Sequence, residues 1–270
     1  MQVSRPRRLS LSTWAVHSWL GVHAPDSPGQ AGPESADVAS FRALAEHLQP
    51  LGIETLEVCH FHLPRAQVTE IAAGLRADGF QTYQLLIDDG DLAHPTDSAR
   101  DAAWMTGWLE RAAEAGFARV RVIAGKTPDP ERLPQVVTHL DALCARATEL
   151  GVRVVFENWY PLMATPDAVL HIAREFGDRI GLCFDFGNWG GPTKYADLGQ
   201  IVHLAESCHA KCQFQDGQPD EADFGRCLEL TREVGFDGPY TLVHGEAHRP
   251  GEPTLWESIR AQADLVRPYL

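Results

Sequence analysis

The stretch from residue 151 to residue 187 reads GVRVVFENWYPLMATPDAVLHIAREFGDRIGLCFDFG, and it predicts a strand, a helix and a second strand in succession. Residues 152–158 and 180–187 are short runs rich in Val, Ile, Leu and Phe, which is typical of strands. Between them, Thr165 followed by Pro166 is typical of the start of a helix, because threonine caps the first turn and proline fits its first position. Two strands joined through a helix run parallel in one sheet.

The same alternation recurs along the chain. Further strands are predicted at 9–19, 53–61, 80–87, 118–125, 207–214 and 239–246. Helices are predicted at 39–48, 64–77, 100–115, 133–150, 166–176, 196–206, 220–234 and 254–268. The first four repeat apolar residues at i, i+3, i+4 and i+7, which is the pattern of a helix with one buried face.

Eight alternations over 270 residues average about 34 residues each, which fits a closed (β/α)8 TIM barrel formed by one domain over residues 1–270. An open doubly wound sheet is the alternative. Neither GxGxxG nor GxxxxGK[ST] follows any predicted strand, so the usual phosphate-binding loops are absent from the sequence.

Composition restricts the class of partner. The formal net charge is −14, and the basic run at Arg5, Arg7 and Arg8 is too short for a nucleic-acid surface, so we expect no nucleic-acid partner. No run approaches the ~18 apolar residues of a membrane span, and no signal peptide is visible. The six cysteines are irregularly spaced and indicate buried thiols in a reducing cytoplasm. Apolar faces on the outer helices could pair subunits in a homo-oligomer.

Three successive predicted strands end in polar residues. Glu157 ends one strand, Asp185 ends the next, and His209 and Lys211 share a face of the third. In a TIM barrel the carboxyl ends of the strands carry the chemistry, so these side chains could converge. Two buried carboxylates and an imidazole suit a divalent cation such as Mn²⁺, Mg²⁺, Co²⁺ or Zn²⁺, which would offset the repulsion between the carboxylates.

These residues resemble a known family. The segment ENWYPLMATPDAVLHIAREFGDRIGLCFDFGNW, followed by HAKCQFQD, resembles the sugar phosphate isomerase/epimerase group of xylose isomerase-like TIM barrels. The resemblance is clearest over residues 150–250. It implies metal ligation by Glu157, Asp185 and His209, and it places Lys211 beside the oxygens of the substrate.

The eighth strand departs from the family pattern. Its members usually end this strand in G-x-x-x-x-E, where the glutamate is both metal ligand and acid/base. Counted from Gly238, the equivalent position is Val243. Glu246, which would also be catalytic, is the preferred fourth ligand, His244 could take its place, and water could fill the position instead.

Other predicted strand ends supply candidate substrate contacts. His60 and His62 lie two residues apart and are expected on one face, while Trp159, Asn188 and Trp189 follow the two carboxylate strands. The tryptophans could form an apolar wall against a sugar ring. The multi-zinc endonuclease branch of the superfamily is not favoured, because its additional ligands are missing and the chain is acidic.

The expected activity is a metal-dependent isomerase or epimerase acting on a sugar or polyol. Glu157 would remove a proton next to a carbonyl, and the cation would stabilise the resulting enediolate. The alternatives are a metal-dependent dehydratase of the inosose type, which expels a hydroxyl from the same intermediate, and a non-catalytic sugar-binding barrel.

Overall fold

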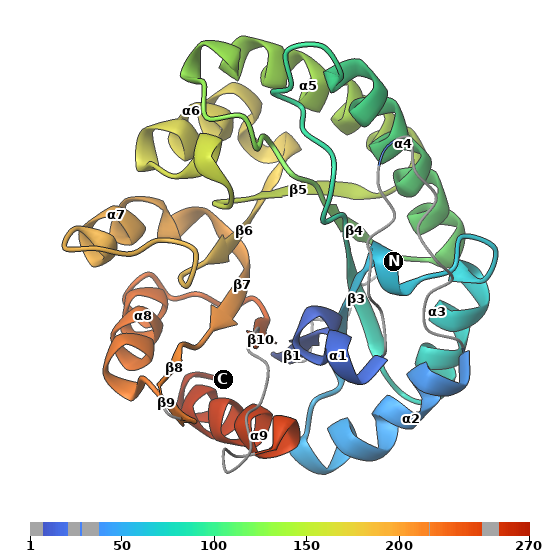
Figure 1. Ribbon diagram of the computed structural model, residues 1–270, viewed down its shortest axis with the longest axis vertical. Helices are drawn as coiled ribbons and strands as arrows, with labels where there is room; N and C mark the ends of the chain where they lie inside the picture. Colours follow the sequence, from blue (N-terminus) through green and yellow to red (C-terminus); the bar gives the residue numbers. More distant parts are fainter. Residues whose placement is uncertain (1–7, 21–27, 29–37, 216, 245–253) are drawn as a thin grey trace.

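The computed structural model describes residues 8–20, 28, 38–215, 217–244 and 254–270. Within these residues, eight parallel strands close into a barrel in the order β1-β10-β7-β6-β5-β4-β3-β2, and helices surround it (Figure 1). Strand β1 pairs with both β2 and β10, so the sheet has no open edge. The predicted (β/α)8 barrel is therefore confirmed, and the open sheet is excluded.

The strands of the barrel are β1 (Leu9–Ser12), β2 (Thr55–Cys59), β3 (Gln81–Leu86), β4 (Arg119–Arg121), β5 (Arg153–Glu157), β6 (Gly181–Asp185), β7 (Ala205–Lys211) and β10 (Tyr240–Val243). A small antiparallel pair, β8 (Phe214–Gln215) and β9 (Gln218–Pro219), follows β7. The helices are α1 (His17–Leu20), α2 (Val38–Leu48), α3 (Val68–Ala77), α4 (Ser98–Ala115), α5 (Leu133–Leu150), α6 (Pro166–Phe176), α7 (Lys194–Ile201), α8 (Glu221–Glu233) and α9 (Leu255–Val266).

Helix α6 shows why the chain forms these elements where it does. The Thr165 hydroxyl accepts from the backbone N–H of Ala168 (3.4 Å), and Pro166 occupies the first turn, as the sequence predicts. The buried face of the helix packs on the barrel through Val169, Ile172 and other apolar residues. The flanking strands β5 and β6 are buried almost throughout, as expected for parallel strands covered by helices.

Two predicted strands end earlier than expected. The strand predicted at 9–19 stops at Ser12, whose hydroxyl accepts from the N–H of Trp14 (3.2 Å) and begins a 3₁₀ turn that leads into α1. The strand predicted at 53–61 stops at Cys59, whose N–H donates to Thr13 Oγ1 (2.8 Å), and a 3₁₀ turn follows. Side-chain hydrogen bonds therefore override strand propensity at this end of the barrel.

The helix predicted at 196–206 is also displaced. It begins at Lys194 and ends at Ile201, and β7 already starts at Ala205. The predicted strand at 239–246 ends at Val243; Glu246 lies outside the described residues.

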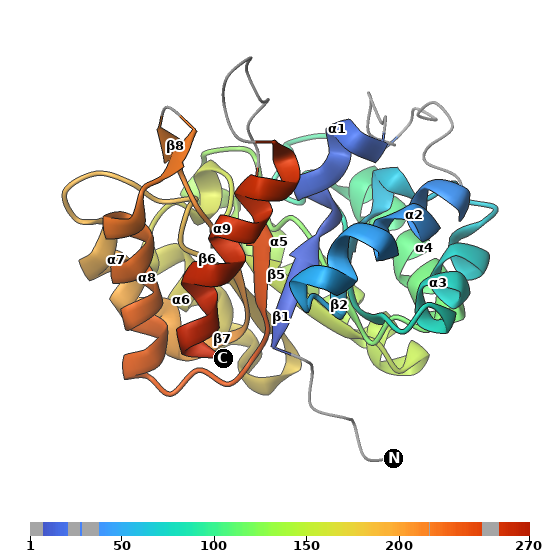
Figure 2. The same cartoon turned by 90° about the horizontal axis from the view of Figure 1, so that it is seen from below.

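The carboxyl ends of the strands define one end of the barrel. In Figure 2 this end is uppermost and carries α1 and β8, while β1 starts from the opposite end. No helix in the described part of the chain is long and apolar enough to cross a bilayer. All six cysteines are free and buried, in agreement with the prediction that they are small core residues.

Candidate active site

A pocket that is partly open to solvent lies at the carboxyl ends of the strands. Trp14, Leu86, Trp159 and Val243 give it apolar surface, and polar residues from β5, β6 and β7 face them. This is the end of the barrel where the sequence places its polar strand ends.

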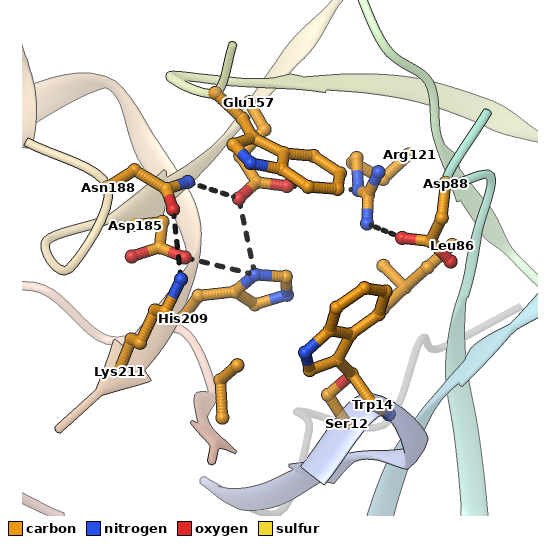
Figure 3. Close-up of a pocket in the computed structure, with 12 residues that line it drawn as sticks. Ser12, Trp14, Leu86, Asp88, Arg121, Glu157, Asp185, Asn188, His209 and Lys211 are labelled. Atoms are coloured by element: carbon orange, nitrogen blue, oxygen red, sulfur yellow. Dashed lines mark hydrogen bonds and ion pairs between the residues drawn. The ribbon is translucent and has the colours of Figure 1, made fainter. Parts of the chain in front are cut away.

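Glu157, Asp185 and His209 converge in this pocket (Figure 3). His209 Nδ1 lies 3.5 Å from Glu157 Oε1 and 3.8 Å from Asp185 Oδ2. One potential ligand atom from each of the three residues lies within 4.8 Å of the other two, and the three side chains are at most 5% exposed. The three residues predicted at successive strand ends therefore lie close together; that they bind a metal stays a prediction.

Strand register brings the three residues together. Asp185 on β6 pairs directly with His209 on β7, and Glu157 is the last residue of the neighbouring β5. The Asn158 side chain then joins the two strand ends, because its Nδ2 donates to Asp185 O and its Oδ1 accepts from Asp185 N, both at 2.8 Å. This pair of hydrogen bonds holds the ends of β5 and β6 together.

Asn188 and Lys211 extend the cluster towards the pocket mouth (Figure 3). Asn188 Nδ2 donates to Glu157 Oε1 (2.8 Å), and Lys211 Nζ donates to Asn188 Oδ1 (3.4 Å). Gly187 makes room for Lys211, since a Cβ at Gly187 would lie 2.6–2.8 Å from the Lys211 Cβ, Cγ and Cδ.

Sequence reasoning overlooked Arg121. Its guanidinium is buried in the pocket wall, where Nη2 donates to Asp88 Oδ1 (2.5 Å) and Nε lies 3.0 Å from Glu157 Oε2. It also lies 5.0 Å from the ring centre of Trp159. The available signal was an arginine in the predicted strand 118–125, because an arginine in a buried strand needs a carboxylate partner.

Glu57 is a second residue whose role the sequence did not reveal. It is fully buried inside the barrel, where its carboxylate accepts from Gln84 Nε2 (3.1 Å) and Thr241 Oγ1 (2.7 Å). Its Oε2 also lies 2.9 Å from His209 Nε2. Glu57 therefore contacts the imidazole nitrogen that faces away from Glu157 and Asp185.

The charges in the site shift the pKa values of its residues. Burial raises the pKa of Glu157, but the nearby charges of Arg121 and His209 outweigh it and leave that pKa below its usual value. Burial opposes the charged form of His209, yet its acidic surroundings hold its pKa well above the ordinary value. Cys183, Glu157 and Glu57 all lie close enough to raise the pKa of His209 if they carry negative charge. Burial raises the pKa of the Cys183 thiol to about 11, so this thiol stays neutral. The negative charge that raises the His209 pKa therefore comes from Glu157 and Glu57.

Cys183 offers a second grouping with Glu57 and His209, deeper in the barrel. A thiol with a raised pKa is a poor ligand, because metals bind the thiolate. The Glu57 oxygens are already hydrogen-bonded to Gln84 and Thr241. The donor set of Glu157, Asp185 and His209 is therefore the better match to a divalent cation.

Comparison with known proteins places the fold in a family. The sequence matches the xylose isomerase-like TIM barrel family over residues 41–265, which is most of the chain. The chain belongs to the xylose isomerase-like TIM barrel family. No curated protein matches its sequence.

Solved structures share the fold of this xylose isomerase-like barrel at low sequence identity. A xylose isomerase-like TIM barrel protein from Mycobacterium smegmatis, in complex with magnesium, is 14% identical with a TM-score of 0.69, covering 97% of this chain and 96% of that one. An L-ribulose 3-epimerase is 11% identical with a TM-score of 0.74, at 97% and 94% coverage. D-psicose 3-epimerase from Clostridium cellulolyticum H10, with D-tagatose, is 14% identical with a TM-score of 0.68, at 97% and 99% coverage.

The eighth strand of this xylose isomerase-like barrel places no ligand beside the triad within the described residues. Thr241 faces the interior, where it contacts Glu57, and Val243, two residues on, lines the pocket. His244 therefore faces the opposite side of the strand and packs edge-on against Phe214, with ring centres 4.7 Å apart. The geometry does not bring His244 to the cluster, and Glu246 lies outside the described residues.

Some of the predicted substrate-binding residues line the pocket, and others do not. Trp159, Asn188 and Lys211 line the pocket. Trp189 does not line it; its indole N–H donates to Met163 O (3.1 Å), and the residue lines a neighbouring pocket instead.

His60 and His62 also lie outside the pocket lining. They belong to a 3₁₀ turn, so the two-residue alternation of a strand does not apply to them. His60 Nδ1 accepts from the N–H of Asp88 (3.1 Å), and His62 Nδ1 lies 2.8 Å from Thr13 Oγ1. Both are fully buried; His60 packs edge-on against Trp104 and Trp108, and His62 packs against Phe61.

Proposed function

We propose that this protein is a divalent-metal-dependent isomerase or epimerase that acts on a small sugar or polyol. The observation that carries the proposal is the convergence of Glu157, Asp185 and His209 on one point inside the strand-end pocket. The epimerase activities named for structures of similar fold support the same reaction class.

The residues present fit a divalent cation. Two carboxylates and an imidazole form a three-residue donor set in which open positions remain for a substrate. The pocket region also holds the carboxylates of Glu57 and Asp88, against the cations Arg121 and Lys211. A divalent ion would offset this excess of negative charge, which is otherwise costly to bury.

The residues around the donor set have separate proposed roles. When bound, the cation would act as a Lewis acid and stabilise the negative charge that develops on a hydroxy-ketone. Lys211 and Asn188 would hold substrate oxygens at the mouth of the pocket, while Trp14 and Trp159 would cover the apolar face of the sugar and exclude water.

Glu157 is the proposed base. Because Arg121 holds its pKa below the usual value, Glu157 remains ionised at neutral pH and can accept a proton. The same charge weakens its affinity for that proton, so the substrate must be acidified before transfer occurs. Glu246 stays a candidate for the second acid/base.

A dehydratase is the second candidate, and Val243 favours it. Epimerisation through two bases needs an acid/base group on each face of the substrate, and the pocket lining at β10 is apolar. A dehydratase can form the same carbanion with one base and then expel a hydroxyl.

Incubation with Mn²⁺ and a panel of ketoses and inososes in D₂O distinguishes these reactions. Deuterium at the carbon next to the carbonyl, without loss of a hydroxyl, supports the isomerase, and a dehydrated product supports the lyase. Glu157→Gln should retain substrate binding and lose turnover by at least about 100-fold. Glu131→Gln, the same change at an exposed residue, is the matched control. Neither exchange nor dehydration with any substrate, despite bound metal, would favour a sugar-binding barrel.

A further inference from the structure

Glu57 is a fully buried carboxylate that crosses the barrel interior. It comes from β2, whereas its partner His209 comes from β7, and the two strands are separated around the barrel by β1 and β10. A buried charge this far from solvent is costly unless several donors surround it. Gln84 and Thr241 provide two such donors, one to each carboxylate oxygen.

The hydrogen-bond pattern sets the proton position on His209. Both Glu57 oxygens accept hydrogen bonds from other groups, so Glu57 acts as the acceptor in this network. His209 Nε2, 2.9 Å from Oε2, must therefore be the donor of that contact. In a neutral imidazole the second nitrogen, Nδ1, then keeps its lone pair.

His209 Nδ1 is the nitrogen that faces the other two proposed ligands. Figure 3 shows it directed to Glu157 and Asp185, at 3.5 and 3.8 Å. We propose that Glu57 is a positioning residue that holds the proton of His209 on Nε2 and so makes Nδ1 the metal-binding atom. This inference rests on the metal site of the proposed function and adds the residue that determines which nitrogen binds.

Glu57→Gln is a sharp test because it preserves size and removes the charge. The oxygen of the new amide can accept from Thr241, and its nitrogen can donate to His209 Nε2. The Gln84 amide can turn over so that its Oε1 accepts from the same nitrogen, since Gln84 Oε1 makes no hydrogen bond in the described structure. That arrangement moves the His209 proton to Nδ1, where it competes with the metal. Outer partners of this kind contribute about 10–100-fold to metal affinity.

The measurement is titration with Co²⁺ alone, monitored by calorimetry, on the full chain. We expect Glu57→Gln to weaken Co²⁺ binding about 10–100-fold. Glu131→Gln is the matched control, because it makes the same change at an exposed residue far from this network; its Co²⁺ affinity should equal that of wild type. Equal affinities for Glu57→Gln and wild type would overturn the inference.

A spectroscopic readout separates positioning from a purely structural role. In ¹⁵N-histidine-labelled wild type loaded with Zn²⁺, the His209 signals, identified by their loss in His209→Asn, should show the metal on Nδ1 and the proton on Nε2. The opposite assignment would overturn the inference, and this readout decides alone if Glu57→Gln does not fold. Wild type that binds neither Co²⁺ nor Zn²⁺ would instead overturn the proposed function, and this inference with it.

Discussion

Arg121 forms ion pairs with two buried carboxylates of the candidate site. It is almost completely buried, and its guanidinium joins Asp88 in the wall of the pocket to Glu157 in the proposed donor set. The pKa of Asp88 shows the effect: burial opposes the charged form of Asp88, but Arg121 and His60 lower its pKa to about 2. Arg121 therefore keeps both carboxylates ionised in a region that water hardly reaches.

Replacement of Arg121 should be strongly destabilising. Arg121→Gln would remove the guanidinium that pairs with the two buried carboxylates of Asp88 and Glu157, and removing one partner of a buried pair costs about 3–5 kcal/mol in the free energy of unfolding. Urea denaturation measures this loss. Arg146→Gln is the control, because its pair with Glu110 is exposed and should contribute little. Similar stabilities for the two variants would contradict the assigned role of Arg121.

His62 should make stability depend on pH. Burial lowers its pKa from 6.5 to about 3, so the folded state excludes a proton that the unfolded chain binds. The stability that comes from keeping His62 neutral is fully present above pH 6.5. It is lost as the pH falls towards 3, at about 1.4 kcal/mol in the free energy of unfolding per pH unit. Urea denaturation of wild type and His62→Gln should therefore show a smaller pH slope in the variant between pH 6.5 and pH 4. Parallel stability curves would refute the assignment to His62.

At the scale of elements, the turn after β6 depends on contact with β7. Gly187 follows Asp185, and its missing side chain leaves room for the stem of Lys211. The close approach involves the Lys211 Cβ, which the strand backbone holds in place, so the lysine cannot simply turn aside.

Gly187→Ala should therefore displace Lys211 or the turn itself. We expect a loss of about 1–3 kcal/mol in stability, as for other overpacked sites, and a raised KM for the substrate. Gly190→Ala is the matched control in the same loop, because a Cβ there meets nothing within 4 Å. Denaturation and steady-state kinetics measure both effects; identical behaviour of the two variants would show that the contact has no consequence.

Several features of these elements could be predicted from sequence, and others could not. The alternation of apolar runs and helices, and the polar residues at 157, 185 and 209, report on local periodicity, which a single chain displays. The early end of β2 depends on Thr13, whose hydroxyl contacts Cys59 and His62, 46 and 49 positions away. A contact between such distant segments produces no periodic pattern in the sequence.

The residues of the candidate site also differ in how far the sequence could predict them. Glu157, Asp185 and His209 were found because each lies at, or within two residues of, the carboxyl end of its strand, a position that the fold makes functional. Glu57 lies inside β2 and Arg121 is the last residue of β4; the charge of each is visible in the sequence, but its partner is not. Which buried carboxylate meets which cation depends on barrel closure, and closure depends on every strand at once.

For the whole molecule, metal binding should stabilise the fold. A ligand that binds only the folded state at 100 times its Kd adds about 2.7 kcal/mol, which in a chain of this size corresponds to a rise in Tm of roughly 5–10 °C. Thermal unfolding with Mn²⁺ or Co²⁺ measures this shift. Asp185→Asn should abolish it, and Glu131→Gln should retain it. An equal shift in wild type and Asp185→Asn would place the ion elsewhere.

The most direct measurement is an anomalous-scattering map from crystals soaked in Mn²⁺. The account predicts one peak within about 2.5 Å of Glu157, Asp185 and the Nδ1 atom of His209. A map in which ordered manganese is absent from these three residues, or lies at another group of side chains, would contradict the central claim that they form a metal centre.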